Sequence, residues 1–255
     1  MNLSVQSGLG YIKKLIDFES SLVEKAEELE VVIFPDFLSL YTVIEMLKGS
    51  FIKIGAQDCF WETRGAYTGE ISPLFLKEAG CEYILLGHPE RIINLRETPE
   101  MMSRKLKTAL DCGLKPFLII YEKPDVKKED VPKQLIEDLM VFISKLSREE
   151  IAKITLIYEP LWAIGTDKAA ATSHIKEVAS KIREFLSSEF RNGLGEKIPI
   201  KYGGGVTSAS SRDIIAIKEL DGIGMGRAGL DIAFFTSTII DANNMLLKKT
   251  NDKGR

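Results

Sequence analysis

The stretch LIYEPLWAIGTDK (residues 156–168) decides the fold, because it leads an apolar strand into a loop of small residues. The strand ends at Glu159, and Pro160 favours an extended conformation for the carboxylate that precedes it. A carboxylate at the end of a buried strand is partly desolvated, which raises its pKa toward the range of a general base. Trp162 provides an apolar side chain that can anchor the start of the following loop. The small residues 163–166 can then form a lid between two hinges. The alternative is a solvated glutamate at a strand end.

Apolar runs of this kind alternate with amphipathic segments along most of the chain. The predicted strands cover residues 31–36, 52–57, 82–88, 115–121, 154–160, 198–204 and 222–226, and predicted helices cover 40–48, 97–111, 131–146, 172–188 and 208–219. Near-continuous apolar strands separated by helices indicate an α/β protein with a parallel sheet covered on both faces. No linker divides the chain, so we expect a single domain over residues 1–255. The strand count is one short of a (β/α)8 barrel.

The overall composition limits the partners that the chain can have. Among 255 residues the net charge is −3 and no block of like charges occurs, which argues against nucleic-acid and electrostatic membrane partners. No leader-like segment and no apolar run approaching 18 residues is present, so we expect a cytoplasmic location. Three cysteines stand far apart and there are two histidines, so we expect neither a disulfide framework nor a metal site.

Polar residues and glycines gather where the predicted strands end, which is where ligands bind in such barrels. His88 follows the run YILLG, and Pro89 suits the first position of a helix. The positive end of a helix dipole favours the neutral form of a histidine at that position. A neutral imidazole can polarise a carbonyl or move a proton between oxygens. The alternative is a structural histidine.

Two glycine-rich turns follow the last two predicted strands. They are KYGGGVTS (201–208) and GIGMGRAG (222–229). Exposed backbone N–H groups in such turns bind anions, and the loops after strands seven and eight of a (β/α)8 barrel often hold phosphate. The turns therefore favour a ligand that carries a phosphate group.

Five segments together resemble the triosephosphate isomerase family, in its order and spacing. They are GAQDCFWETRGAYTGEIS (55–72), ILLGHPER (84–91), YEPLWAIGT (158–166), YGGGV (202–206) and DGIGMGRAG (221–229). The resemblance implies a (β/α)8 barrel and a cytoplasmic, cofactor-free isomerase of glycolysis and gluconeogenesis. Such an enzyme interconverts glyceraldehyde 3-phosphate and dihydroxyacetone phosphate through an enediolate.

The same resemblance implies roles for individual residues. Glu159 is the base, His88 stabilises the enediolate, and residues 160–168 form the lid. The substrate's phosphate lies near Gly165, Gly205 and Gly226. The loop around Thr68 reaches into a partner's site, which implies a homodimer, and Glu70 forms a structural ion pair with Arg91.

The chain departs from the family pattern at its start. The family's first strand carries an Asn-x-Lys element whose lysine contacts the substrate, and this sequence begins after that point. We expect the barrel to lack its first strand and the chain as given to be severely impaired. The favoured explanation is a longer natural protein read from an internal methionine, and the alternative is a barrel with seven strands.

A second departure concerns the substrate. Arg227 stands where the family usually has a glycine, and we expect it to lie at the phosphate site. The arginine and IFPD (33–36) resemble isomerases that act on four-carbon ketose phosphates such as erythrulose phosphate. Two alternatives to a triose-phosphate isomerase therefore stay open: a tetrulose-phosphate isomerase, and a catalytically dead barrel that binds phosphosugars.

Overall fold

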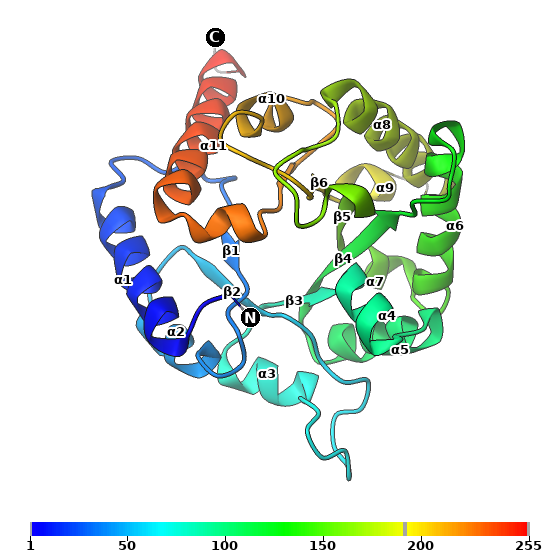
Figure 1. The fold of residues 1–255 in the computed structure, drawn as a ribbon, viewed down its shortest axis with the longest axis horizontal. Coiled ribbons are helices and arrows are strands. Elements are labelled where there is room, and N and C mark those ends of the chain that lie inside the picture. The colour runs from blue at the N-terminus through cyan, green and yellow to red at the C-terminus, as the bar shows by residue number, and fades with distance from the viewer. Residues whose placement is uncertain (1, 191–192, 254–255) are drawn as a thin grey trace.

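The computed structural model describes residues 2–190 and 193–253, in which seven parallel strands follow one another around a curled sheet (Figure 1). The strands are β1 (Val32–Ile33), β2 (Lys53–Ala56), β3 (Tyr83–Leu86), β4 (Lys115–Glu122), β5 (Thr155–Pro160), β6 (Ile200–Tyr202) and β7 (Gly222–Ile223). All seven predicted strands are confirmed, most of them with shorter bounds than the apolar runs. Each strand pairs with the next one in chain order, as the strands of an α/β barrel do.

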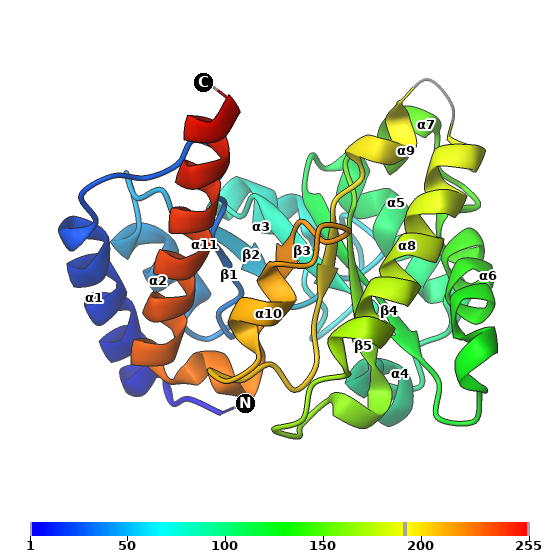
Figure 2. The same cartoon turned by 90° about the horizontal axis from the view of Figure 1, so that it is seen from above.

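Helices surround this sheet on its outer side (Figures 1 and 2). They are α1 (Val5–Ser21), α2 (Leu40–Met46), α3 (Pro73–Ala79), α4 (Pro89–Leu95), α5 (Pro99–Asp111), α6 (Val131–Ile143), α7 (Arg148–Ile151), α8 (Thr172–Glu189), α9 (Leu194–Lys197), α10 (Ser211–Ile215) and α11 (Ile232–Lys253), with short 3₁₀ turns η1 (Lys128–Asp130), η2 (Leu161–Ala163) and η3 (Arg227–Leu230). Each predicted helix is confirmed. Among the helices of the described residues, none is long and apolar enough to cross a membrane.

The strands place alternate side chains inside the barrel and against the helices. The larger core cluster joins strands to helices and includes Leu118, Tyr158 and Tyr202. A smaller cluster inside the barrel contains Tyr83, Phe117, Ile119 and Ile157, with Val32, Phe34 and Leu85 at its edge. Because both faces of the sheet are covered, the strands read as nearly continuous apolar runs in the sequence.

The sheet does not close between β7 and β1 within the described residues, whereas the helical layer does. Helix α1 contacts α11, and the Tyr11 hydroxyl donates a hydrogen bond to the carbonyl of Gly229 at 2.7 Å. The Asn243 side chain in α11 accepts from the N–H of Ala26 and donates to the carbonyl of Glu24, both at 2.8 Å. The expected barrel lacking one strand is confirmed for this part of the chain.

Candidate active site

Glu159 lies at the carboxyl end of β5, where the register with β4 is continuous from Phe117↔Thr155 to Glu122↔Pro160. Burial, together with a smaller effect of the negative charge of Glu90, raises the pKa of the Glu159 carboxyl to about 7. One oxygen of this carboxylate, Oε2, is buried and has no hydrogen-bond partner in the structure. A carboxylate without fixed donors and with a pKa near neutrality is suited to accept a proton from a ligand.

The turn after β6 makes room for this carboxylate. A Cβ atom at Gly203 would overlap Oε1 of Glu159, so a larger residue would push the carboxylate out of place. Gly203 is therefore a positioning residue for Glu159. In the sequence, Gly203 belongs to a glycine-rich turn that predicts phosphate binding. Nothing in the sequence distinguishes its role from that of the other glycines in the turn.

His88 caps the amino terminus of α4, at the carboxyl end of β3. The N–H of Glu90 donates to Nδ1 of His88 at 3.3 Å, so Nδ1 is an acceptor and the proton of the neutral ring belongs on Nε2. Burial lowers the pKa of His88, Glu90 opposes this effect, and Arg91 adds to it. The neutral ring presents an Nε2–H donor at the same end of the sheet as Glu159. Glu90, in the first turn of α4, is close enough to Glu159 to raise the pKa of its carboxyl.

The loop after β5 meets both glycine-rich turns. It runs through η2 and continues to Lys168, and Gly165 within it has a φ of +71° and an exposed backbone. A Cβ at Gly205 would overlap the carbonyl of Lys168, so the turn after β6 packs closely against the end of this loop. On the other side, Arg227 Nη2 lies 3.1 Å from Asp167 Oδ1, next to Gly226. The predicted phosphate residues thus come from three loops that converge at residues 167–168.

Several known proteins are similar to this chain over most of its length. The sequence profile of the family described as triosephosphate isomerase matches residues 1–242. The triosephosphate isomerase of Dictyoglomus thermophilum is 38% identical over 221 residues, which cover 86% of this chain and 87% of that protein. That of Clostridium botulinum strain Loch Maree is 35% identical over 240 residues, covering 94% and 95%. The chain belongs to the triosephosphate isomerase family.

In this family member, the first turn of the loop after β5 is held by a buried carboxylate, Glu122. Glu122 Oε1 accepts from Trp162 Nε1 at 3.1 Å, and Oε2 accepts from the Tyr158 hydroxyl at 2.7 Å. His174 Nε2 lies 3.1 Å from the same Oε2. Burial favours the protonated carboxyl, but these hydrogen bonds prevail and lower the pKa of Glu122. Glu122 begins the charged run EKPDVKKED (122–130), but it is the last residue of β4 and is only 8% exposed.

A second buried cluster holds α4, and with it His88. Arg91 contacts Asp58 and Glu97, each at 2.8 Å, and Lys105 Nζ lies 2.8 Å from Asp58 Oδ2 and 2.5 Å from Glu97 Oε1. Among the described residues of a single copy, the carboxylates that pair with Arg91 are Asp58 and Glu97, and Glu70 is exposed. The ion pair of Glu70 with Arg91 that the resemblance implies stays a prediction.

No group of three or more histidine, cysteine, aspartate or glutamate side chains in the described residues is arranged to hold a metal ion. The groups that this chain itself supplies at the strand ends are a general base, a neutral histidine donor and backbone N–H groups. Glu159 and His88 lie on strands two apart in the sheet, at the same carboxyl edge. Such a set suits proton transfer next to a carbonyl group.

Proposed function

We propose that the chain is a cofactor-free aldose–ketose isomerase that interconverts glyceraldehyde 3-phosphate and dihydroxyacetone phosphate. The observation that carries the proposal is Glu159, a carboxylate that burial leaves with a pKa of about 7 and with one buried oxygen free of partners. The names of its relatives from Dictyoglomus and Clostridium support the same activity.

In this proposal, Glu159 takes the proton from the carbon next to the substrate's carbonyl. The electron pair of the broken C–H bond forms the enediolate, and its oxygen accepts a hydrogen bond from Nε2–H of His88. His88 moves the proton of the neighbouring hydroxyl to the former carbonyl oxygen, and Glu159 returns its proton to the neighbouring carbon, so that the former hydroxyl carbon becomes the carbonyl carbon. The lowered pKa of His88 keeps its ring neutral, and the neutral ring donates its Nε2–H as a hydrogen bond to the enediolate oxygen. A glutamate base and a neutral histidine are the established pair in triosephosphate isomerase, so the mechanism is the family's own.

The phosphate of the substrate is placed where three loops converge. Backbone N–H groups of Gly165, Gly205 and Gly226 bind the phosphate oxygens, and the guanidinium of Arg227 adds a positive charge beside them. Closure of residues 160–168 excludes water from the enediolate. Trp162, bonded to Glu122, fixes the point at which that loop leaves β5.

We also propose that residues 1–255 by themselves turn over slowly. The resemblance assigns a substrate-binding lysine to a strand between β7 and β1, and the described residues place no strand there. Without a cation beside it, the enediolate loses electrostatic stabilisation, which costs a factor of about 100 to 1,000 in rate.

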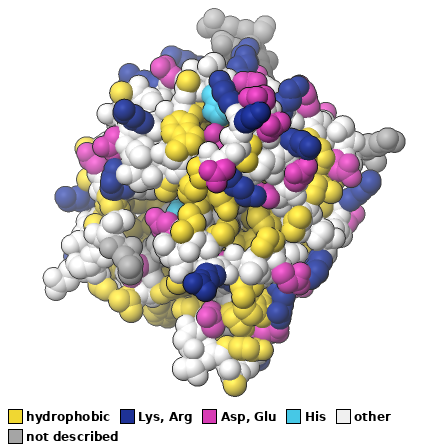
Figure 3. Space-filling model, turned by 45° about the vertical axis from the view of Figure 1, so that its right-hand side comes forward, with side chains coloured by type: hydrophobic (Ala, Val, Ile, Leu, Met, Phe, Trp, Pro, Cys, Tyr) yellow, Lys and Arg dark blue, Asp and Glu magenta, His cyan; other side chains and the backbone are white. Residues whose placement is uncertain are grey.

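We also propose that the chain forms a homodimer and is located in the cytoplasm. The loop between β2 and α3 projects from the barrel (Figure 1), and Tyr67, Thr68 and Gly69 at its tip are exposed. An exposed, protruding loop of this kind fits a pocket in a second copy. Acidic and basic side chains are mixed over the face drawn in Figure 3, which favours a small-molecule substrate over nucleic acid.

The test is isomerisation of glyceraldehyde 3-phosphate by purified residues 1–255, with Glu159→Gln as the control for contaminating enzyme. We expect a slow rate that falls at least about 100-fold in the variant. Erythrulose phosphate is assayed beside it, because Arg227 at the phosphate site favours the four-carbon alternative. If neither substrate turns over but both bind, the chain is the phosphosugar-binding barrel instead. Sedimentation with and without residues 65–69 tests the dimer.

A further inference from the structure

The turn that follows β7 contains Gly226 and Arg227, two of the residues proposed to lie at the substrate's phosphate. We call residues 225–230 the phosphate turn. Just before it, the N–H of Gly224 donates to the carbonyl of Tyr202 in β6 at 2.7 Å. Within the described residues this is the last hydrogen bond that joins the segment to β6, so the turn itself lies beyond the support of the sheet.

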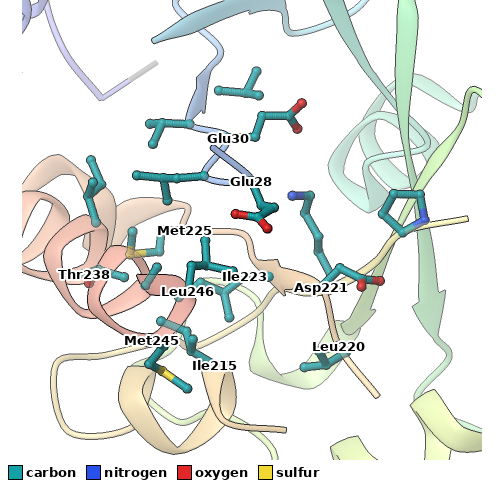
Figure 4. A pocket seen from close by; sticks show the side chains of 18 of the residues that line it. Glu28, Glu30, Ile215, Leu220, Asp221, Ile223, Met225, Thr238, Met245 and Leu246 are labelled. Atoms are coloured by element: carbon teal, nitrogen blue, oxygen red, sulfur yellow. The ribbon is translucent and has the colours of Figure 1, made fainter. Parts of the chain in front are cut away.

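The segment that leads into the phosphate turn is also open on the side that faces β1. A cavity of about 460 Å³ lies between β7 and β1, and Ile223 and Met225 line it. Figure 4 shows these two side chains at the cavity, together with Thr238 and Leu246 of α11. At Gly226, an added Cβ atom would meet no heavy atom within 4 Å. The orientation of the turn therefore depends on contacts made after Gly226.

The Tyr11 hydroxyl supplies such a contact from α1. It donates to the carbonyl of Gly229 within η3 at 2.7 Å, although the two residues are 218 positions apart in the sequence. The N–H of Gly229 in turn donates to the carbonyl of Gly226 at 3.0 Å. One hydrogen bond thus ties Gly229 to α1, and the next ties it to the glycine whose N–H is proposed to bind phosphate.

Tyr11 has a fixed place where α1 meets α11 (Figures 1 and 2). Its neighbours Ile12 and Leu15 are buried in the core, and its ring centre lies 6.2 Å from that of Phe235 in α11. Burial raises the pKa of the Tyr11 hydroxyl, and the charge of Asp231 adds to this effect. The hydroxyl therefore keeps its proton and stays a hydrogen-bond donor.

The end of the phosphate turn is held by the start of α11. The N–H of Asp231 donates to the carbonyl of Ala228 at 3.2 Å, and Asp231 Oδ1 accepts from the N–H of Ala233 at 3.0 Å. These bonds join neighbours in the sequence, and they leave the turn free to rotate together with the first turn of the helix. The bond from Tyr11 comes from a different helix, so it limits that rotation.

We propose that Tyr11 is a positioning residue for phosphate binding, whose hydroxyl holds Gly229, and through it the N–H of Gly226, in the orientation that receives the substrate's phosphate. The inference rests on the proposed function, because it adds a residue to the same site. In this role Tyr11 acts through the phosphate turn and not on the reacting carbons. Loss of its hydroxyl weakens phosphate binding and leaves proton transfer by Glu159 in place.

The test is Tyr11→Phe, which keeps the ring beside Phe235 and removes only the hydroxyl. We expect KM for glyceraldehyde 3-phosphate to rise about fivefold, and kcat to stay within about twofold. Calorimetry measures the binding of glycerol 3-phosphate, a phosphate ester without a carbonyl group, and its Kd is expected to rise by the same factor. The matched control is Tyr41→Phe on the exposed side of α2, which leaves KM and Kd unchanged.

The loss of one hydrogen bond lowers the thermal midpoint by only about 2–4 °C, so both proteins are compared in the folded state. A weaker Kd in Tyr11→Phe supports the inference even if neither protein turns over, a result that would overturn the isomerase alone. An unchanged Kd overturns the role of Tyr11 and leaves the isomerase standing, as does a fall in kcat at constant KM. If the unaltered chain does not bind glycerol 3-phosphate, the inference is also overturned, because the turn then holds no phosphate.

Discussion

The two sides of the barrel differ in how far their strands are paired. On the closed side, formed by β3 to β6, the register of β4 with β5 runs over six residue pairs, whereas β1 with β2 and β6 with β7 have two each. Glu159 and His88 both lie on the closed side, and Arg227 follows β7 on the open side, formed by β7 and β1. The two residues proposed to transfer protons thus lie at the ends of more extensively paired strands, and the loop proposed to bind phosphate follows the weakly paired strand β7.

The largest effect is expected at the ion cluster beneath His88. Lys105 is 2% exposed and contacts both Asp58 and Glu97, so Lys105→Met leaves two buried carboxylates with one cation, Arg91. Breaking a buried ion pair in this way costs about 3–5 kcal/mol of unfolding free energy. Urea unfolding measures it. The exposed Lys145→Met is the matched control, and a loss below about 1 kcal/mol would show that the cluster does not hold α4.

A matched pair of isoleucines compares the two sides directly. Ile120 in β4 is 1% exposed, whereas Ile223 in β7 is half-buried and lines a cavity between β7 and β1. Because a fully packed site loses more contacts, Ile120→Ala is expected to cost about 3 kcal/mol and Ile223→Ala about 1 kcal/mol. Chemical denaturation of both variants gives the comparison. Equal costs would mean that the open side is packed as tightly as the closed side.

The sequence predicts the closed side better than the open side, for a physical reason. Strands buried on both faces need apolar residues at every position, so β4 and β5 are visible as runs and their bounds nearly match. β1 and β7 pair over two residues each, and their apolar runs extend into loops. The length and pairing of a strand depend on its neighbour, which a run of residues does not reveal.

Some residues of the candidate site can be predicted from the sequence and others cannot. Glu159 and His88 are conspicuous, because a charged or titratable group directly follows an apolar run. Glu122 also ends such a run, and that position was the available signal for its burial. The partnership of Asp58 with Lys105, 47 residues apart, has no signal in a single sequence, since contacts between distant segments depend on the packing of helices.

The pH dependence of stability tests the environment of Glu159. Its pKa is about 7 in the folded protein against an ordinary value of 4.5, so between these pH values the folded state holds a proton that the unfolded state has released. Stability therefore falls as pH rises through this window, by about 2 kcal/mol between pH 5 and 8. Glu159→Gln should reduce the slope. Denaturation curves at several pH values that run parallel for both proteins would contradict the burial argument.

The smallest effect is expected where the two sides meet, at the ion pair between Asp167 in the loop after β5 and Arg227 after β7. Both side chains are mostly exposed, at 82% and 57%, so the pair contributes below about 1 kcal/mol to stability. The ion pair is expected to affect substrate binding instead, because it holds the guanidinium of Arg227 beside the converging glycine loops. Asp167→Asn is expected to leave the thermal midpoint within about 2 °C and to change KM for the phosphate substrate more than kcat. Exchanging the two charges, Asp167→Arg with Arg227→Asp, restores the pair but moves the cation onto the lid. Recovery of KM in that double variant would show that the link between lid and loop matters more than the place of the positive charge.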